Sequence, residues 1–459
     1  MNFTHIYFIG IGGIGMSAIA RWFRHEGKQV AGYDRTPTPL TRQLEAEGIP
    51  VHYEDNFLLV PDGFRDKKHT LVVYTPAIPE NHDELTSLRR EGFEMVKRSE
   101  ILGVIARDKT VLAVAGTHGK TTVSTMTAWF DHEIGRAGAF LGGISKNFDS
   151  NLVLGGSDRL VVEADEFDRS FLRLYPNTAV ITAVDADHLD IYGTYDAVKE
   201  AFSEFVSQIK PGGALVLKKG IDLEIRNKHL RLYRYAYDTP CDFYAKNITL
   251  LDGGISAFDL VCPDRTIRDC RTGVPGWVNV ENAIAATALL WCTGGFDADD
   301  RIRAAIASFR GVKRRFDFHI NTPEIVYMDD YAHHPAELRA AITSLRGIFP
   351  GRRLTAIFQP HLYTRTHDFA PEFAEALSLA DEVALLPIYP ARELPIAGVE
   401  SELILKDITV PRRLLQKEEL LPFVENTDLD VLVTFGAGDI DVYCEPIVEM
   451  LRRKTRIDA

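Results

Sequence analysis

A strand–loop–helix pattern at residues 111–125, VLAVAGTHGKTTVST, constrains the fold of this chain more than any other feature. An apolar strand leads into a loop whose glycines flank a histidine, and Lys-Thr-Thr then opens a helix. Backbone N–H groups around Gly116 and Gly119, the charge of Lys120 and the helix N-terminus together form a cradle for a polyphosphate. The Thr121 hydroxyl is placed to ligate Mg²⁺. The pattern therefore predicts a nucleotide triphosphate site in an α/β fold.

This loop departs from the strict Walker pattern, because Val114 stands where the first glycine belongs. The alternative interpretation is an ordinary strand-to-helix turn that happens to contain glycine. We prefer phosphate binding because the apolar strand, the glycines, the GKT triplet and the helix occur in the order that the mechanism needs. The candidate nucleotide-binding residues of the loop are Gly116, Thr117, His118, Gly119, Lys120, Thr121 and Thr122.

Length and charge narrow the class of protein. At 459 residues the chain exceeds what one hydrophobic core usually supports, so two or three domains are expected. A net charge of −13 argues against nucleic acid or an anionic membrane as a bulk partner. Five scattered cysteines without a C-x-x-C pair suit a reducing compartment and are interpreted as structural. Without a signal-peptide pattern or an apolar run of membrane length, the sequence predicts a cytoplasmic protein.

A second glycine pattern, Gly10-x-Gly12-x-x-Gly15, follows a predicted strand over residues 5–9 and precedes a predicted helix over residues 16–26. Alone, this pattern is typical of NAD binding. The pattern itself indicates only that a diphosphate binds, or that backbones pack closely, at a helix N-terminus. Nucleotides other than NAD are therefore also compatible with it. The candidate binding residues here are Gly10, Gly12, Gly13, Gly15, Met16 and Asp34.

Acidic residues gather where two predicted strands of the middle region end. The cluster Glu163, Asp165, Glu166 and Asp168 follows one strand, and Asp187-His188 follows the next. Carboxyl ends of parallel strands are where α/β folds bind ligands, and four carboxylates need cations or basic neighbours. The cluster therefore predicts a Mg²⁺ site beside the phosphate loop, with Glu163 as the best ligand, although a solvated acidic turn is the alternative.

A third α/β segment begins near residue 313, with predicted helices over residues 335–346 and 369–379. The sequence Asp329-Asp330-Tyr331-Ala332-His333-His334-Pro335 lies at a strand-to-helix junction, where Pro335 suits the first helical position. Because neighbouring residues point in different directions, we expect one acid to contact a ribose or the shell of a magnesium ion, and one histidine to contact a substrate. The runs at residues 313–315 and 359–366 bring arginines that suit phosphates or carboxylates.

Ten segments along nearly the whole chain resemble the Mur ligases, in the order typical of that family. They are IGIGGIGMSAIA, AGTHGKTT, EADEFDRSFL, DADHLDIY, NVENAIAA, GVKRRFDF, DDYAHHPAE, FQPHLYTRTHDF, IYPARELPI and FGAGDI. The resemblance implies three α/β domains: a Rossmann-like UDP-substrate domain over residues 1–106, a P-loop ATPase-like domain over 107–312, and a Rossmann-like amino-acid domain over 313–459.

The resemblance, closest to the alanine-adding type, implies ATP-dependent formation of an amide in peptidoglycan precursor synthesis. The lactyl carboxylate of UDP-N-acetylmuramate would attack ATP, and L-alanine would displace phosphate from the acyl phosphate. The glycine loop at residues 10–15 would then hold UDP, which displaces the NAD interpretation. The implied roles are Lys120 on the transferring phosphate, Thr121, Glu163 and His188 on Mg²⁺, Asn279 on adenine, Arg315 and Asp330 on the nucleotide, and His334 and Arg365 on the reacting carboxylate and amino acid.

Three departures or absences bear on this resemblance. Leu362 stands where the family pattern has arginine, and Val278 replaces a histidine that often precedes Asn279. Ser203 stands near the position of a carbamylated lysine in later family members, and the alanine-adding type lacks that lysine too. A ligase that recycles a preformed tripeptide, an NAD-dependent dehydrogenase and a non-catalytic nucleotide-binding scaffold remain the alternatives. Oligomeric state stays open between monomer and homodimer.

Overall fold

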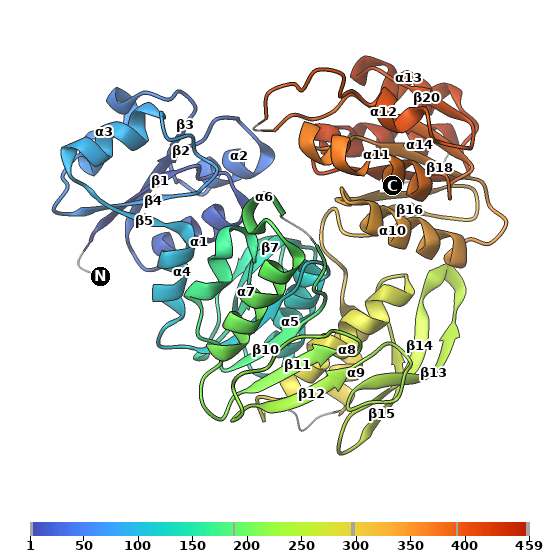
Figure 1. Cartoon of the computed structure of the whole chain (residues 1–459), viewed down its shortest axis with the longest axis horizontal. Coiled ribbons are helices and arrows are strands. Elements are labelled where there is room, and N and C mark those ends of the chain that lie inside the picture. Colours follow the sequence, from blue (N-terminus) through green and yellow to red (C-terminus); the bar gives the residue numbers. More distant parts are fainter. Residues whose placement is uncertain (1–2, 187–188, 295–298, 392, 456–459) are drawn as a thin grey trace. The chain divides into compact units, whose positions relative to one another are not determined.

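The computed structural model describes residues 3–186, 189–294, 299–391 and 393–455 of the chain (Figure 1). It divides into two compact units. Unit 1 comprises residues 1–248, 257–273 and 280–310, and unit 2 comprises residues 249–256, 274–279 and 311–459.

Unit 1 begins with a five-stranded sheet whose strands all run parallel (Figure 1, blue). In spatial order the strands are β3 (Val51–His52), β2 (Gln29–Tyr33), β1 (His5–Ile9), β4 (Thr70–Tyr74) and β5 (Glu94–Lys97). The helices are α1 (Ile14–His25), α2 (Pro39–Ala46), α3 (Asp83–Glu91) and α4 (Arg98–Ala106). Side chains of β1 alternate between two cores: Ile6 and Phe8 pack with α1 and α4, and Tyr7 and Ile9 pack with α3. Helices thus cover both faces, as in a doubly wound fold.

The second sheet of unit 1 has seven strands and carries the phosphate loop. Its spatial order is β12 (Arg231–Tyr235), β11 (Ala214–Lys218), β10 (Thr178–Ile181), β6 (Thr110–Ala115), β9 (Arg159–Glu163), β7 (Gly138–Ser145) and β8 (Ser150–Val153). Only the pair β7–β8 is antiparallel among the pairings of its described strands. The register joins Val114 of β6 to Glu163 of β9 and Ala115 of β6 to Ile181 of β10. The loop after β6 is therefore flanked by the ends of β9 and β10.

Helices and a small sheet complete the middle of the chain. The helices are α5 (Lys120–Ile134), α6 (Leu189–Tyr192), α7 (Tyr195–Ser207), α8 (Trp277–Trp291) and α9 (Asp299–Ser308). The small sheet has the order β13 (Tyr244–Leu250), β14 (Ser256–Val261) and β15 (Thr266–Arg271). One hydrophobic core contains Ile6 of the first sheet, Ile101 of α4, Val162 of the second sheet and Phe205 of α7. The two large sheets of unit 1 therefore share a core.

Unit 2 is built around a six-stranded sheet with helices on both faces (Figure 1, orange to red). Its spatial order is β16 (Asp317–Asn321), β17 (Val326–Asp330), β21 (Val431–Phe435), β18 (Leu354–Phe358), β19 (Glu382–Leu385) and β20 (Arg412–Leu414). β16 is antiparallel to β17, and the other pairs are parallel. The helices α10 (Pro335–Ile348), α11 (Tyr363–Leu377) and α12 (Glu402–Leu405) share one core with the sheet, and α13 (Leu420–Asn426) and α14 (Cys444–Thr455) share the other.

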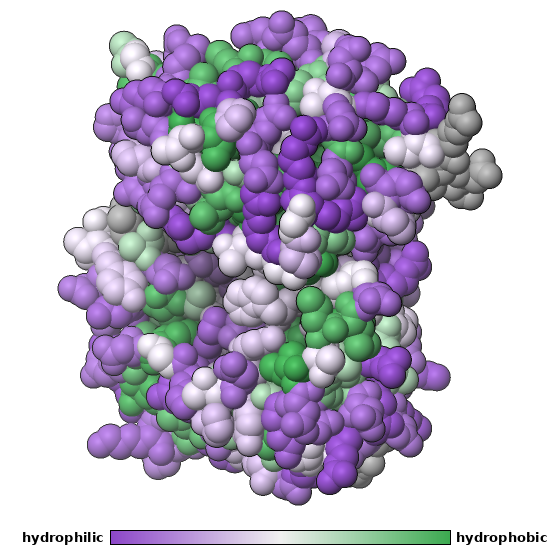
Figure 2. All heavy atoms as spheres, turned by 90° about the vertical axis from the view of Figure 1, so that its right-hand side faces the viewer, coloured by the Kyte–Doolittle hydropathy of each residue, from purple (hydrophilic) through white to green (hydrophobic). Residues whose placement is uncertain are grey.

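The predicted α/β class is confirmed, and one predicted helix was wrong at its start. The sequence placed a helix over residues 369–379, whereas α11 begins at Tyr363. The chain kinks near Pro371, with Phe369 at φ −122°, and the helix continues through both residues. No helix among the described residues is long and apolar enough to cross a membrane. The face drawn in Figure 2 carries mostly hydrophilic side chains, with apolar ones in separate patches.

Candidate functional site

The loop after β6 has the backbone that a phosphate cradle requires. Gly116 has φ +139°, and a Cβ atom there would lie 2.2 Å from Thr182 Oγ1 and 2.8 Å from the Ala183 backbone nitrogen. Gly119 has φ +81° and precedes α5 without any side-chain cap. Both conformations favour glycine strongly. The N-terminal N–H groups of α5 therefore have no side-chain acceptor at the cap position and are available to an anion.

Lys120 is held by the loop itself and by a buried acid. Its Nζ donates to the Gly116 carbonyl oxygen over 2.6 Å and to Glu166 Oε1 over 2.8 Å. Burial lowers the pKa of Lys120, but Glu166 and Asp165 outweigh burial and raise the pKa above its ordinary value. The ammonium group therefore stays charged at the position where a transferring phosphate would need it.

Glu163, at the end of β9, faces the first turn of α5. Its carboxylate accepts hydrogen bonds from Thr121 Oγ1 (3.0 Å), Ser124 Oγ (3.2 Å) and the Gly142 backbone N–H (2.9 Å). A Cβ atom at Gly142 would lie 2.3 Å from this carboxylate, so a larger residue there would displace the Glu163 side chain. The arrangement brings together the two side chains predicted as Mg²⁺ ligands in the described part of the chain.

The other three acids of the EADEFD cluster have basic partners. Asp165 Oδ2 pairs with Arg98 Nη2 at 3.0 Å, and Asp168 Oδ2 pairs with Lys97 Nζ at 3.2 Å. Glu166 pairs with Lys120, as described above. None of the ion pairs found among the described residues involves Glu163. Basic side chains thus balance three of the four carboxylates, and Glu163 is the one whose charge a cation would balance.

The end of β10 borders the other side of the loop. Thr117 Oγ1 lies 3.2 Å from both Asp185 Oδ2 and the Asp185 backbone nitrogen. His118 Nε2 lies 3.5 Å from the same carboxylate oxygen. These contacts hold Thr117 and His118 against the segment that follows β10. His188 itself lies outside the described residues.

The first glycine loop is packed differently. Gly10 has φ +87°, and a Cβ atom there would lie 2.8 Å from Thr75 Cγ2. The Gly12 backbone N–H donates to Asp34 Oδ2 over 2.7 Å. Gly13 is the N-cap of α1, with no side-chain cap, and Met16 is buried in the first turn. The predicted substrate residues are therefore brought together, and Asp34 orients the loop through a backbone hydrogen bond.

Helix α8 contains two asparagines, Asn279 and Asn282, and only Asn279 was predicted from the sequence to contact adenine. The Asn279 side chain donates to the Pro275 carbonyl oxygen over 2.6 Å in the turn before the helix. Asn282, one turn later, has its Oδ1 3.6 Å from the position that a Cβ atom on Gly119 would occupy. Asn282 thus lies at the phosphate loop, and its spacing of three from Asn279 on a helix was the signal that could have found it.

In unit 2, Asp330 organises the loop that carries Arg315. Its carboxylate accepts from the backbone N–H groups of Phe316 (2.8 Å) and Ala332 (2.7 Å). Burial raises the pKa of Asp330 to about 7, against the opposing effect of Arg315. The Arg315 guanidinium lies over the Tyr331 ring at 4.8 Å. Asp330 and Arg315, both predicted to contact the nucleotide, therefore belong to one local structure.

The two adjacent histidines of unit 2 have separate surroundings. His334 is the N-cap of α10, with its Nδ1 accepting from the Ala336 N–H over 3.4 Å, and Pro335 takes the predicted first helical position. His333 Nδ1 lies 3.0 Å from the Tyr331 carbonyl oxygen and 3.5 Å from Glu337 Oε2. Burial lowers the pKa of His333 to about 4, so its ring is neutral near pH 7.

Arg365 lies in the first turn of α11, which starts from an unusual backbone. Leu362 is buried at φ +72° and forms the N-cap of this helix. The Thr364 N–H donates to Glu393 Oε2 over 3.0 Å, which supplies the cap that leucine cannot. The Arg365 charge contributes to lowering the pKa of His333. The charge of Arg365 therefore acts on the His333 ring.

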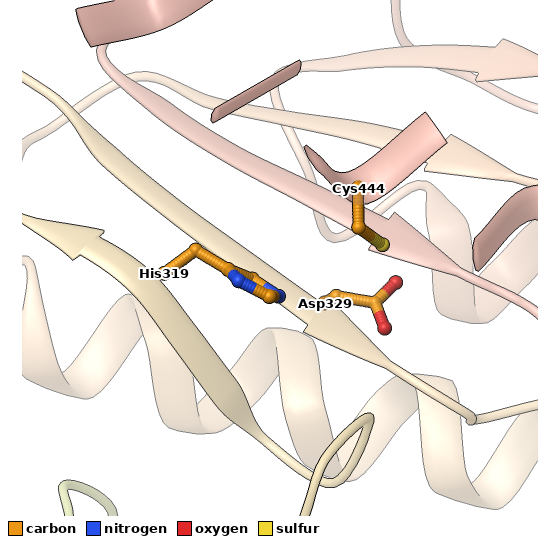
Figure 3. Close-up of side chains that lie close together, drawn as sticks. All are labelled: His319, Asp329 and Cys444. Carbon is orange, nitrogen blue, oxygen red and sulfur yellow. The ribbon is translucent and has the colours of Figure 1, made fainter. Parts of the chain in front are cut away.

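A further group of potential metal ligands, His319, Asp329 and Cys444, lies inside unit 2 (Figure 3). Both Asp329 oxygens already have partners: Thr434 Oγ1 donates to Oδ1 over 2.8 Å and Arg314 Nε to Oδ2 over 3.1 Å. Burial raises the pKa of Cys444 to about 12, which keeps the thiol protonated. A guanidinium beside the site disfavours a cation, so we interpret the group as a polar part of the core.

Two basic residues that pair with acids of the EADEFD cluster were not found from the sequence. Lys97 and Arg98 precede the phosphate loop by about twenty positions, and their partners Asp168 and Asp165 follow it by more than forty. No local pattern links them. The sequence did contain one indication of these ion pairs. Two adjacent basic residues stand at a strand-to-helix junction, and the EADEFD segment has more acids than a metal site needs.

Two glycine loops at helix N-termini, a charged lysine and a carboxylate beside hydroxyl groups are the features expected of an α/β protein that binds nucleotides. Family models match almost the whole chain: "Mur ligase family, catalytic domain" over residues 5–110, "Mur ligase middle domain" over 114–290 and "Mur ligase, glutamate ligase domain" over 314–438. The chain therefore belongs to the Mur ligase family.

Individual relatives agree with this assignment. The chain is 51% identical over 460 residues to a UDP-N-acetylmuramate–L-alanine ligase of Parabacteroides distasonis, covering 99% of this chain and 98% of the relative. The crystal structure of a UDP-N-acetylmuramate–alanine ligase from Thermotoga maritima matches with a TM-score of 0.81 at 28% identity, covering 98% and 99%. A murein peptide ligase from Psychrobacter arcticus matches in fold, with a TM-score of 0.71 at 24% identity and 98% of each chain covered.

Proposed function

We propose that this protein joins L-alanine to the lactyl carboxylate of UDP-N-acetylmuramate, with ATP converted to ADP and phosphate. The observation that carries the proposal is the full-length identity of 51% to an alanine-adding ligase. We propose that UDP binds at the loop of residues 10–15 and ATP at the loop of residues 116–122. The reaction belongs to peptidoglycan precursor synthesis, and its need for ATP favours a cytoplasmic location.

In the first step, a lactyl carboxylate oxygen forms a bond to the γ-phosphorus of ATP while the bond from that phosphorus to the bridging oxygen of ADP breaks. Lys120 would balance the charge that spreads over the transferring phosphoryl group. The N–H groups at the start of α5 would hold the other phosphates. Orientation of the two anionic reactants by the two loops would supply much of the acceleration.

In the second step, the L-alanine amine forms a bond to the acyl carbon, and phosphate leaves with the C–O bond electrons. We propose that Arg365 binds the alanine carboxylate and that His334 faces the reacting acyl group. The amine must be deprotonated to attack, so its proton passes to a nearby base or to water. Asn279, Arg315 and Asp330 are proposed to contact the adenine nucleotide.

The residues around Thr121 suit a magnesium ion. Mg²⁺ prefers oxygen ligands, and Glu163 and Thr121 offer a carboxylate and a hydroxyl at the edge of the phosphate loop. Glu163 is also the carboxylate of its cluster that lacks an ion-pair partner among the described residues. We propose Thr121, Glu163 and His188 as the groups that hold Mg²⁺. When bound, the ion would offset negative charge on the phosphates.

The proposal is tested by measuring phosphate release from ATP with UDP-N-acetylmuramate and one of four acceptors: L-alanine, glycine, L-serine or the tripeptide. Release should be fastest with L-alanine and should need both the UDP substrate and Mg²⁺. Release that depends on the tripeptide alone would instead assign the recycling reaction. Turnover of NADH would overturn the ligase class altogether.

A further inference from the structure

Arg98, the first residue of α4, lies directly against the first glycine loop. A Cβ atom on Gly15 would be 2.6 Å from Arg98 Nη1 and 3.3 Å from Arg98 Cδ, so the guanidinium occupies the space that the glycine leaves. Gly15 belongs to the first turn of α1, beside the N-terminal N–H groups proposed to hold the UDP diphosphate. The positive charge of Arg98 therefore adds to the potential of this loop.

The same guanidinium reaches the acidic cluster of the ATP loop. Arg98 Nη2 donates to Asp165 Oδ2 over 3.0 Å. The charges of Arg98 and Lys120 both act on the Asp165 carboxylate. Asp165 therefore interacts with both cations. Lys120 also forms an ion pair with Glu166, with the nitrogen and oxygen 2.8 Å apart.

We propose that Arg98 is a positioning residue shared by the two nucleotide loops: its charge favours the UDP diphosphate at Gly15 and neutralises Asp165 beside the ATP loop. This inference rests on the proposed function, because it needs both nucleotides to bind where the two loops are. It assigns to a residue outside both glycine motifs a role in the affinity for both substrates.

Loss of the Arg98 charge then has two separate consequences. The UDP loop loses a nearby positive charge, which weakens its hold on the diphosphate. Asp165 becomes an uncompensated carboxylate close to Lys120, where it competes with ATP for the lysine and repels the phosphates. A residue that contacted only one nucleotide would change only one affinity.

The experiment uses the full-length enzyme and five variants: Arg98→Gln, Arg98→Lys, Asp165→Asn, the double variant Arg98→Gln/Asp165→Asn, and Lys97→Gln as matched control. Lys97 neighbours Arg98 and also pairs with an acid of the cluster, Asp168 at 3.2 Å, so its substitution removes the same charge and one ion pair. Dissociation constants for ADP and for UDP-N-acetylmuramate are measured by calorimetry, and Michaelis constants for both substrates by phosphate release.

Arg98→Gln should raise the dissociation constants for both ligands roughly tenfold, the effect of losing one charge-assisted hydrogen bond. The double variant should recover affinity for ADP, because the uncompensated carboxylate is gone, while affinity for the UDP substrate stays weak. Lys97→Gln should leave both constants within about twofold. Arg98→Lys should restore part of both affinities, since it keeps the charge.

Two results would overturn the inference. One is an Arg98→Gln enzyme that loses affinity for a single ligand or for neither, and the other is a double variant in which both affinities stay weak. A general structural defect would lower kcat without this split between the two ligands. Failure of the wild-type enzyme to bind UDP-N-acetylmuramate at all would count against the proposed function, and so would be distinguished from failure of the role of Arg98.

Discussion

The two glycine loops of unit 1 start from the same local design and differ in what surrounds them. Each follows a buried parallel strand, β1 or β6, and each leads into a helix whose N-cap is a glycine without a side-chain cap, Gly13 or Gly119. At the first loop, space beside the glycines is filled by Thr75, Asp34 and Arg98. At the second, Lys120 points back over the loop.

The difference lies in how charge is arranged. Asp34 orients the first loop by accepting from the Gly12 N–H, while Lys120 and the Glu163 carboxylate, which accepts from Thr121, flank the second. The first arrangement suits a diphosphate that is only bound. The second suits a phosphate that is transferred, because transfer needs cations to balance developing charge. A strand–glycine–helix pattern therefore predicts where phosphate binds, and the charged neighbours indicate what happens to it.

The largest expected effect tests whether transfer depends on the second loop alone. Lys120→Ala should lower kcat by about a thousandfold, because charge on the transferring phosphoryl group loses its nearest cation. Binding of UDP-N-acetylmuramate should stay within about threefold, which calorimetry can measure. Near-normal turnover in this variant would remove the distinction between the loops.

Glu163→Gln should have the next largest effect. The amide keeps the size of the side chain but loses the charge that a magnesium ion would need, so turnover at about 1 mM Mg²⁺ should fall roughly a hundredfold. Excess Mg²⁺ should recover part of the loss in a metal titration. Asp168→Asn is the matched control, because Asp168 already pairs with Lys97, and it should change turnover by no more than about twofold.

Two alanine substitutions compare the backbones of the loops. Gly116→Ala should lower the free energy of unfolding by about 3 kcal/mol, since φ is +139° and a Cβ atom would meet the backbone of Ala183. Gly13→Ala should cost only a few tenths of a kcal/mol, because φ is −62° and the nearest atom to a Cβ lies 3.6 Å away. Urea denaturation measures both free energies of unfolding. Equal losses of stability in the two variants would contradict the stated difference between the two backbones.

Helix α3, which packs on the sheet of the first loop, contains a buried acid, Glu84. Its carboxylate accepts a hydrogen bond from the Tyr7 hydroxyl over 2.7 Å. Burial raises the pKa of Glu84 to about 8, so the folded state holds a proton that the unfolded state loses near pH 4.5. Stability should therefore fall as pH rises from about 4.5 to about 8. Glu84→Gln should flatten this dependence and add about 1–3 kcal/mol at pH 8, by thermal or urea denaturation.

The smallest effect concerns the orientation of the first loop. Asp34→Asn should weaken the hydrogen bond from the Gly12 N–H by removing its charge, and should raise the Michaelis constant for the UDP substrate about threefold. The Michaelis constant for ATP should not change. A larger effect on ATP than on the UDP substrate would show that the two loops are not independent in this respect.

Sequence reasoning reached the parts of the site that are local in the chain. Strand periodicity and glycine spacing located β1, β6 and the helices after them, and Glu163 was selected because it is the first acid to follow a buried strand. Arg98 and Lys97 were missed because their partners are about seventy residues away, and only the fold brings them together. The start of α11 was misplaced because Leu362 adopts a left-handed backbone that no local pattern predicts for leucine.

The core shared by the two large sheets of unit 1 has a consequence for dissecting this family. The boundary between the first two family models falls between residues 110 and 114, yet apolar side chains from both sides of it form one cluster. Asn151 of β8 also donates to Ser17 of α1, and Arg21 of α1 donates back to Asn151. Residues 1–110 therefore share apolar and polar contacts with the segment that follows them. Chimeras that exchange residues 1–110 between relatives will need to carry α1, α4 and the surface of β8 together.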